Sequence, residues 1–262
     1  MIFGYAILFS AHLSVSFSND YFDIENDKLS RPTLFTGGSG ILVQHPELSS
    51  FAKKFAIFLI LLSLVLAILF IVHYSFNWFF FILILTGSLL GWYYSAPPVR
   101  FVSRGLGEVT TMITAGILLP GMGYFILMGG FEQSFLIFLL PLLFYGLAFI
   151  ISVEIPDLDC DQRGNKMTFV TRFGRNTGFG VIAFLLAISA VYFILISFVI
   201  QSIINLMMVA VFSFLPFGIG LAAALKKPSN NFDLATKFAT SNVSAYILFV
   251  LILDIYLIWL LH

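Results

Sequence analysis

The stretch FAIFLILLSLVLAILFIV, Phe55–Val72, contains no charged residue, and Ser63 is its one polar side chain. An α-helix needs about 20 such residues to cross the roughly 30 Å hydrocarbon core of a bilayer. The whole chain shares this character: 60% of its 262 residues are apolar, 10% are charged, and the mean hydropathy is +1.03. A soluble domain carries about 25% charged residues. The composition therefore excludes a soluble globule and a disordered chain, and it indicates a polytopic helical membrane protein.

Eight apolar stretches are long enough, or nearly long enough, to span a bilayer. We predict spans at about 2–18, 52–72, 78–95, 107–128, 134–155, 177–199, 203–225 and 243–261. The expected fold is all-α: a transmembrane helical bundle that forms a single integral-membrane domain over residues 1–262. The single cysteine excludes a disulfide framework and a cysteine-based zinc site.

The connections between these spans differ sharply in charge. Four are long and polar, at 19–51, 96–106, 156–176 and 226–242. All 13 Lys and Arg residues, and every acid except Glu132 and Asp254, lie in or beside these four connections. The positive-inside rule places them in the cytoplasm, so polar chemistry is expected on that face and both chain ends on the other. The net charge of zero gives no sign of a nucleic-acid partner.

The first long connection opens with an acidic segment, NDYFDIEND. Asn19, Asp23 and Asp27 are spaced four residues apart, so they share one face if the preceding helix continues. Asp20 lies on nearly the same stripe as Asp27. Carboxylates at this spacing repel one another. A divalent cation, held by these oxygen ligands together with phosphate oxygens, is the partner that best offsets this repulsion.

The third long connection repeats the pattern. Its acids are Glu154, Asp157, Asp159 and Asp161, and the bases Arg163 and Lys166 follow. Acids for a metal beside bases for phosphate form the combination that binds a diphosphate with Mg²⁺. One acidic cluster alone is more often a solvated loop or a helix cap. Two clusters on the same membrane face, each beside apolar helices, favour a binding site.

Other segments on this face are less specific. In Tyr93–Arg100 (YYSAPPVR), two prolines end a predicted span, and hydroxyl groups and Arg100 lie at the end of that span. An aromatic belt at the membrane interface explains this segment equally well. Thr36–Gly40 (TGGSG) is expected to be a plain turn rather than a phosphate cradle, because it lacks the P-loop lysine. Glu108 is expected to complement the dipole of a helix that begins beside it.

Taken in order, these segments resemble the UbiA superfamily of intramembrane prenyltransferases. Asn19-Asp20-x-x-Asp23-x-x-x-Asp27 is similar to its first aspartate-rich motif, and Asp157-x-x-x-Asp161 followed by Gly164-Asn165-Lys166 is similar to its second. Tyr94-Ser95-x-Pro97-Pro98 with Arg100 resembles the segment between them. The resemblance covers nearly the whole chain. It implies helices around a central cavity that opens to the cytoplasmic side. Because the family has nine helices, its first is expected to be missing upstream of Met1.

The resemblance also implies an activity: Mg²⁺-dependent transfer of a prenyl group from an isoprenoid diphosphate to a small aromatic acceptor. It implies two Mg²⁺ ions, held by Asn19, Asp23, Asp27, Asp157 and Asp161, with Asp20 in support. The implied contacts to the diphosphate or the acceptor are Arg31, Tyr94, Ser95, Arg100, Arg163 and Lys166.

The branch of the family is less sharply marked. RGLGE (Arg104–Glu108) and the wording NDYFD are most similar to the dihydroxynaphthoate prenyltransferases of menaquinone synthesis, although Ser16 stands where that branch often has Asn. Hydroxybenzoate, a glycerol-phosphate lipid and a tetrapyrrole stay open as acceptors. An ion-coupled transporter is the alternative from another class. It is disfavoured because transporters place ionisable groups near the midplane, and only Asp254 lies well inside a predicted span.

Overall fold

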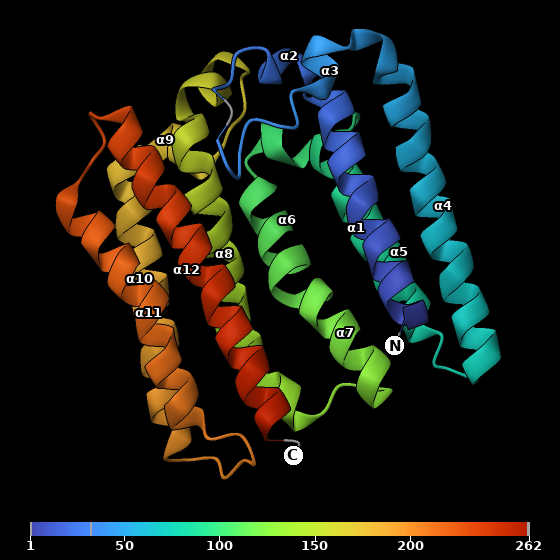
Figure 1. Ribbon diagram of the computed structural model, residues 1–262, viewed down its shortest axis with the longest axis vertical. Coiled ribbons are helices and arrows are strands. Elements are labelled where there is room, and N and C mark those ends of the chain that lie inside the picture. The colour runs from blue at the N-terminus through green and yellow to red at the C-terminus, as the bar shows by residue number, and fades with distance from the viewer. Residues whose placement is uncertain (1, 32, 261–262) are drawn as a thin grey trace.

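The fold is described from a computed structural model that covers residues 2–31 and 33–260 (Figure 1). These residues form helices and loops, with no strand among them. The long helices are α1 (Ile2–Phe22), α4 (Ser49–Tyr74), α5 (Phe79–Ser95), α8 (Gln133–Arg163), α10 (Arg175–Ser197), α11 (Leu206–Lys226) and α12 (Phe232–Trp259). Another long helix has three parts: α6 (Gly107–Ile113), a π-helical turn (Thr114–Leu118) and α7 (Leu119–Met128). The short helices are α2 (Ile24–Asp27), α3 (Ile41–Gln44) and α9 (Phe169–Phe173), with 3₁₀ turns at Pro46–Leu48 and Phe101–Arg104.

Six helices in the described ranges are long and apolar enough to cross a membrane. They are Pro46–Tyr74, Gly107–Met128, Gln133–Arg163, Arg175–Ser197, Leu206–Lys226 and Phe232–Trp259. They match six of the eight predicted spans. The other two predicted spans, 2–18 and 78–95, correspond to α1 and α5, which are helical but are not among the six. Spanning by these two helices stays a prediction.

The core consists of two apolar clusters. In the first, Phe179 and Phe193 of α10 pack with Tyr145 of α8, together with residues of α11 and α12. In the second, Ile7 of α1 and Phe80 of α5 pack with residues of α4 and α7. The long helices lie side by side, with α2, α3 and α9 gathered at one end (Figure 1). The polar connections that carry these short helices therefore lie at one end of the bundle (Figure 1).

The π-helical turn, in the helix that includes α7 of the second cluster, packs against α8, a helix of the first cluster. Gly116 lies in that turn, and its α-carbon packs on Gly146 of α8. A Cβ on Gly116 would come 2.6 Å from the carbonyl oxygen of Leu142. Small residues at such a crossing let two helix backbones approach closely.

We expect Gly116→Val to destabilise the protein by about 1–3 kcal/mol, because the added side chain overpacks this crossing. Gly123→Val is the matched control, since it lies in α7 of the same long helix and no atom lies within 4 Å of its added Cβ. Thermal unfolding in detergent measures both variants. An equal loss of Tm in the two would contradict the close packing at Gly116.

Candidate functional site

The first arm of the site is the end of α1 and its continuation into α2. Asp23 lies at a bend between the two helices. The hydrogen bonding nevertheless continues: the Asp23 amide donates to the Asn19 carbonyl at 2.8 Å, and the Asp27 amide donates to the Asp23 carbonyl at 2.8 Å. The four-residue spacing therefore keeps Asn19, Asp23 and Asp27 on one side of the chain. This confirms the predicted continuation of the helix.

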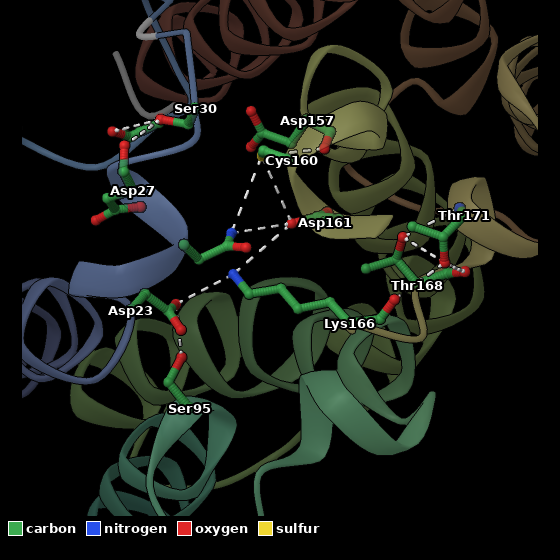
Figure 2. Close-up of polar contacts among 12 residues, drawn as sticks. Asp23, Asp27, Ser30, Ser95, Asp157, Cys160, Asp161, Lys166, Thr168 and Thr171 are labelled. Atoms are coloured by element: carbon green, nitrogen blue, oxygen red, sulfur yellow. Dashed lines mark hydrogen bonds and ion pairs between the residues drawn. The ribbon is translucent and has the colours of Figure 1, made fainter. Parts of the chain in front are cut away.

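The second arm is the last turns of α8 and the reversal after them. Asp157 and Asp161 lie one turn apart in the helix. The helix is capped at Gly164, and Asn165 adopts a left-handed conformation with φ of +54°. The chain thereby turns back, and the Lys166 amide donates to the Asp161 carbonyl at 2.9 Å. This reversal directs the lysine side chain toward the first arm (Figure 2).

The two arms meet at Lys166. Its ammonium nitrogen lies 3.3 Å from Asp23 Oδ2 and 3.8 Å from Asp161 Oδ1 (Figure 2). Ser95, at the end of α5, donates its hydroxyl to Asp23 Oδ2 at 3.0 Å. The Asn26 amide donates to Asp161 Oδ1 at 3.3 Å, and if the amide is flipped its oxygen accepts from the lysine at 3.2 Å. Three separate helices thus contribute to one polar cluster.

This cluster has an excess of negative charge. Burial, which is the largest cause, and the nearby Asp23 carboxylate together raise the pKa of Asp27 to about 6, although Lys166 opposes both effects. Burial lowers the pKa of Lys166, but the carboxylates of Asp23 and Asp161 outweigh it and the pKa is raised overall. One ammonium group therefore does not neutralise these acids. The arrangement favours binding of additional positive charge.

The oxygen donors fit Mg²⁺ that is shared with a substrate. Asn19 Oδ1 is buried and has no hydrogen-bond partner in the described part of the chain. Within those same residues, no three Asp, Glu, His or Cys side chains group closely enough to hold one ion by themselves. Mg²⁺ is usually held by one or two carboxylates plus waters and phosphate oxygens. The residues present suit a metal that binds with a phosphate-containing ligand.

The glycine-rich segment Thr36–Gly40 packs on the first arm. Ser39 donates its hydroxyl to Asp20 Oδ2 at 2.5 Å and its amide to Asp20 Oδ1 at 3.4 Å. Gly38 lies so close to the Asp27 carboxylate that a Cβ would overlap it. The segment is irregular in structure and contacts two acids of the first arm; that it is a plain turn rather than a phosphate cradle stays a prediction. Asp20 thus links the glycine-rich segment to the end of α1.

Four predicted contact residues are not among those that join the cluster by a hydrogen bond or an ion pair. The guanidinium carbon of Arg31 is 5.2 Å from the ring centroid of Phe232, at the beginning of α12. Arg100 and Arg163 are exposed, and neither forms an ion pair with a described residue. Tyr94 packs its hydroxyl against Gly107. Contacts from these four side chains to a substrate stay predictions.

The structure also adds residues that the motifs did not indicate. Asn26 lies inside the first motif but was not singled out, although its amide contacts Asp161. Glu108 is buried, and its carboxylate accepts a hydrogen bond from the amide of Phe169, the first residue of α9. The expectation that Glu108 only complements the dipole of its own helix was therefore incomplete. Nothing in the sequence indicates a partner this far along the chain.

The acids of the third connection divide between two roles. Asp157 and Asp161 lie on the side of α8 near Lys166 (Figure 2), whereas Asp159 Oδ2 lies 3.0 Å from a guanidinium nitrogen of Arg175. Both carboxylate oxygens of Glu154 are buried and have no hydrogen-bond partner within the described ranges. Only two of these four acids therefore belong to the polar cluster.

Comparison with known proteins identifies this arrangement. The model of the UbiA prenyltransferase family matches residues 1–253. The chain belongs to the UbiA prenyltransferase family. Members of this family are prenyltransferases, so the protein is an enzyme of that class and the transporter alternative is wrong. Together with the six apolar helices of spanning length, membership supports an integral membrane protein.

Solved structures share the fold at low sequence identity. A UbiA homologue from Archaeoglobus fulgidus bound to GPP and Mg²⁺ is 17% identical with a TM-score of 0.65, covering 94% of this chain and 87% of that one. The same homologue bound to DMAPP and Mg²⁺ is 17% identical with a TM-score of 0.63, at 95% and 91% coverage. A digeranylgeranylglyceryl phosphate synthase is 20% identical with a TM-score of 0.62, at 95% and 83% coverage. No curated protein matches the chain.

Asp27 is a predicted metal ligand, and changing a neighbour that positions such a ligand typically costs about 10–100-fold in activity. We therefore expect Gly38→Ala to lower prenyl transfer about tenfold. The new Cβ would push against the Asp27 carboxylate. Gly40→Ala is the control, because its φ of +70° matches the +64° of Gly38 while no atom lies within 4 Å of its added Cβ. Both variants place an alanine at a positive φ and so share the same backbone strain. The difference between their rates therefore reports the contact with Asp27. Equal rates would contradict the proposed support.

Proposed function

We propose that this enzyme transfers a prenyl group from an isoprenoid diphosphate, bound with Mg²⁺, to a small aromatic acceptor. The observation that carries the proposal is the convergence of Asp23 and Asp161, from two arms far apart in the sequence, on Lys166. Further support comes from the Archaeoglobus homologue, which was solved with GPP or DMAPP and Mg²⁺.

The acids have the role of holding the metal. We assign two Mg²⁺ ions to oxygen ligands from both arms: Asn19, Asp23, Asp27, Asp157 and Asp161. When bound, Mg²⁺ would neutralise the charge that develops on the diphosphate as the allylic C–O bond breaks. Asp20 keeps the glycine-rich turn against this group through Ser39.

The other polar side chains bind and orient. Lys166, half-buried at the junction of the arms, is positioned to contact a diphosphate oxygen, and Ser95 fixes the Asp23 carboxylate by donating to it. Arg31, Arg100 and Arg163 are assigned to the outer phosphate oxygens, and Tyr94 to the donor head or the acceptor. The apolar helices beside the site surround the prenyl tail and exclude water that would quench an allylic cation.

For the acceptor we propose dihydroxynaphthoate, which would place the enzyme in menaquinone synthesis. The support is the RGLGE segment, in which Glu108 is buried. Its carboxylate accepts a hydrogen bond from the first residue of α9, which follows the chain reversal at Gly164–Lys166. We further propose that the site opens to the cytoplasm, because the positively charged connections lie at the same end of the bundle as the acids.

The test uses membranes that contain the enzyme, Mg²⁺, labelled geranylgeranyl or longer diphosphates, and four acceptors offered separately. The acceptors are dihydroxynaphthoate, hydroxybenzoate, a glycerol-phosphate lipid and a tetrapyrrole. Labelled product with dihydroxynaphthoate alone is expected, with loss of product in EDTA and recovery when Mg²⁺ is restored. Product with another acceptor instead would overturn the menaquinone assignment. Product that persists in EDTA would overturn the metal role.

A further inference from the structure

A hollow of about 630 Å³ lies beside the beginning of α4, away from the acid site. Its polar lining comes from Tyr21, Glu47, Ser49, Ser50, Lys53 and Lys54. Tyr21 is two residues before Asp23, which places it on nearly the opposite side of the helix from the acids. The hollow is therefore a separate feature on the outer side of the first arm.

The hollow carries more positive than negative charge, because two lysines and one carboxylate line it. Neither Lys53 nor Lys54 forms an ion pair within residues 2–31 and 33–260. The Lys53 ammonium lies 5.2 Å from the ring centroid of Tyr21, which restrains it at the wall. The Glu47 carboxylate, the one acid in the lining, lies 3.1 Å from His45 Nδ1. The charge of the hollow thus suits an anion.

An apolar stripe leads away from the hollow along α4. Ile57 lines the hollow and is 40% exposed, and it lies one turn beyond Lys53. Leu61, Val65 and Leu69 continue at the same four-residue spacing and are all more than half exposed. Residues four apart follow one another along a helix face. The surface therefore offers a cationic head site followed by a continuous apolar strip.

The position of this surface matches the boundary of a bilayer. α4 has 26 residues and so spans about 39 Å. This is longer than the roughly 30 Å hydrocarbon core, so one end of the helix reaches the headgroup layer. The end that carries Lys53 and Lys54 is the one that lies beside the polar connections (Figure 1).

We propose that the hollow binds the phosphate of an anionic phospholipid, whose acyl chain lies along Ile57, Leu61 and Val65. A free phosphate would use the lysines but not the stripe, whereas a phospholipid uses both. The bound lipid would also tie the beginning of α4 to Tyr21 of α1, close to the first acidic motif. This inference does not depend on the identity of the acceptor or of the prenyl donor.

The test compares lipid retained by the intact enzyme in nanodiscs of phosphatidylcholine mixed with phosphatidylglycerol, measured by native mass spectrometry. Lys53→Gln with Lys54→Gln is expected to reduce retained phosphatidylglycerol by about fivefold for each lysine. The matched control is Lys226→Gln with Lys227→Gln, an adjacent lysine pair at the end of α11. A several-fold smaller loss in the control supports a defined site. Equal losses in the two pairs, or none in the first, would overturn it.

A second arm separates a phospholipid from a free anion. Ile57→Asn leaves both lysines in place, so it should lower retained phosphatidylglycerol while the Tm in pure phosphatidylcholine stays at the wild-type value. Added inorganic phosphate should not displace the lipid from the wild-type protein. Displacement by phosphate, or unchanged retention by Ile57→Asn, would show that the hollow binds only the charged group and would overturn the lipid assignment.

Discussion

Asp23→Ala is expected to abolish prenyl transfer, lowering kcat/KM by about 10³-fold or more, while the protein still inserts and folds. Asp23 Oδ2 accepts from Ser95 and lies 3.3 Å from Lys166, so its loss removes the ion pair between the first arm and Lys166. It also removes a proposed metal ligand, and a single preorganised electrostatic group already supplies about 10²–10³ in rate. The measurement is initial rate in membranes with saturating Mg²⁺.

Asp159→Ala provides the matched control for that variant. Asp159 belongs to the third connection, as Asp157 and Asp161 do, but its side chain is 62% exposed and pairs with Arg175 outside the cluster. Its rate should stay within a few-fold of wild type. A rate for Asp23→Ala that also lies within a few-fold of wild type would refute the metal role of the first arm.

Lys166→Met is expected to have two opposite effects. It should lower turnover of the diphosphate by about 10²–10³-fold, because the site loses the cation at the junction of its two arms. It should also strengthen the binding of Mg²⁺ in the absence of diphosphate. The ammonium now lies against the Asp23 and Asp161 oxygens that we assign to the metal, so the two cations compete for the same donors. Calorimetric titration of metal alone and steady-state kinetics measure the two effects separately.

The control for the lysine variant is Lys237→Met, an exposed position in α12 that forms no ion pair with a described residue. It should change neither quantity. If Lys166→Met weakened metal binding as well as turnover, the lysine would be organising the acids for the metal and the competition would be disproved.

Hydropathy predicted where helices exist better than where they end. The predicted span 134–155 lies inside α8, which continues to Arg163, and the predicted span 2–18 lies inside α1, which continues to Phe22. Apolar runs stop at the boundary of the lipid, whereas a helix can continue into the polar layer. The hydropathy pattern did not predict the π-helical turn at Thr114–Leu118, because this turn packs closely against α8, which is distant in the sequence.

The sequence predicted each arm of the site but not how the arms connect. Spacing of four residues placed Asp23 and Asp27 on one face of the first arm, and the backbone hydrogen bonds agree. The contact of Lys166 with Asp23 depends on the reversal at Gly164 and on packing between helices distant in sequence, which no local pattern encodes. The same reason applies to Glu108, whose partner is in α9.

The two arms differ in how they are built, and this has a consequence for how specificity can change. α8 is one unbroken helix of 31 residues, about 46 Å long, so Asp157 and Asp161 are fixed by packing along its whole length. The first arm bends at Asp23 and continues into a turn with positive-φ glycines at Gly37, Gly38 and Gly40. Substitutions in that turn would move the Asp20 and Asp27 side chains that it contacts without disturbing any long helix. The first connection is therefore the natural target for engineering this enzyme toward other donors or acceptors.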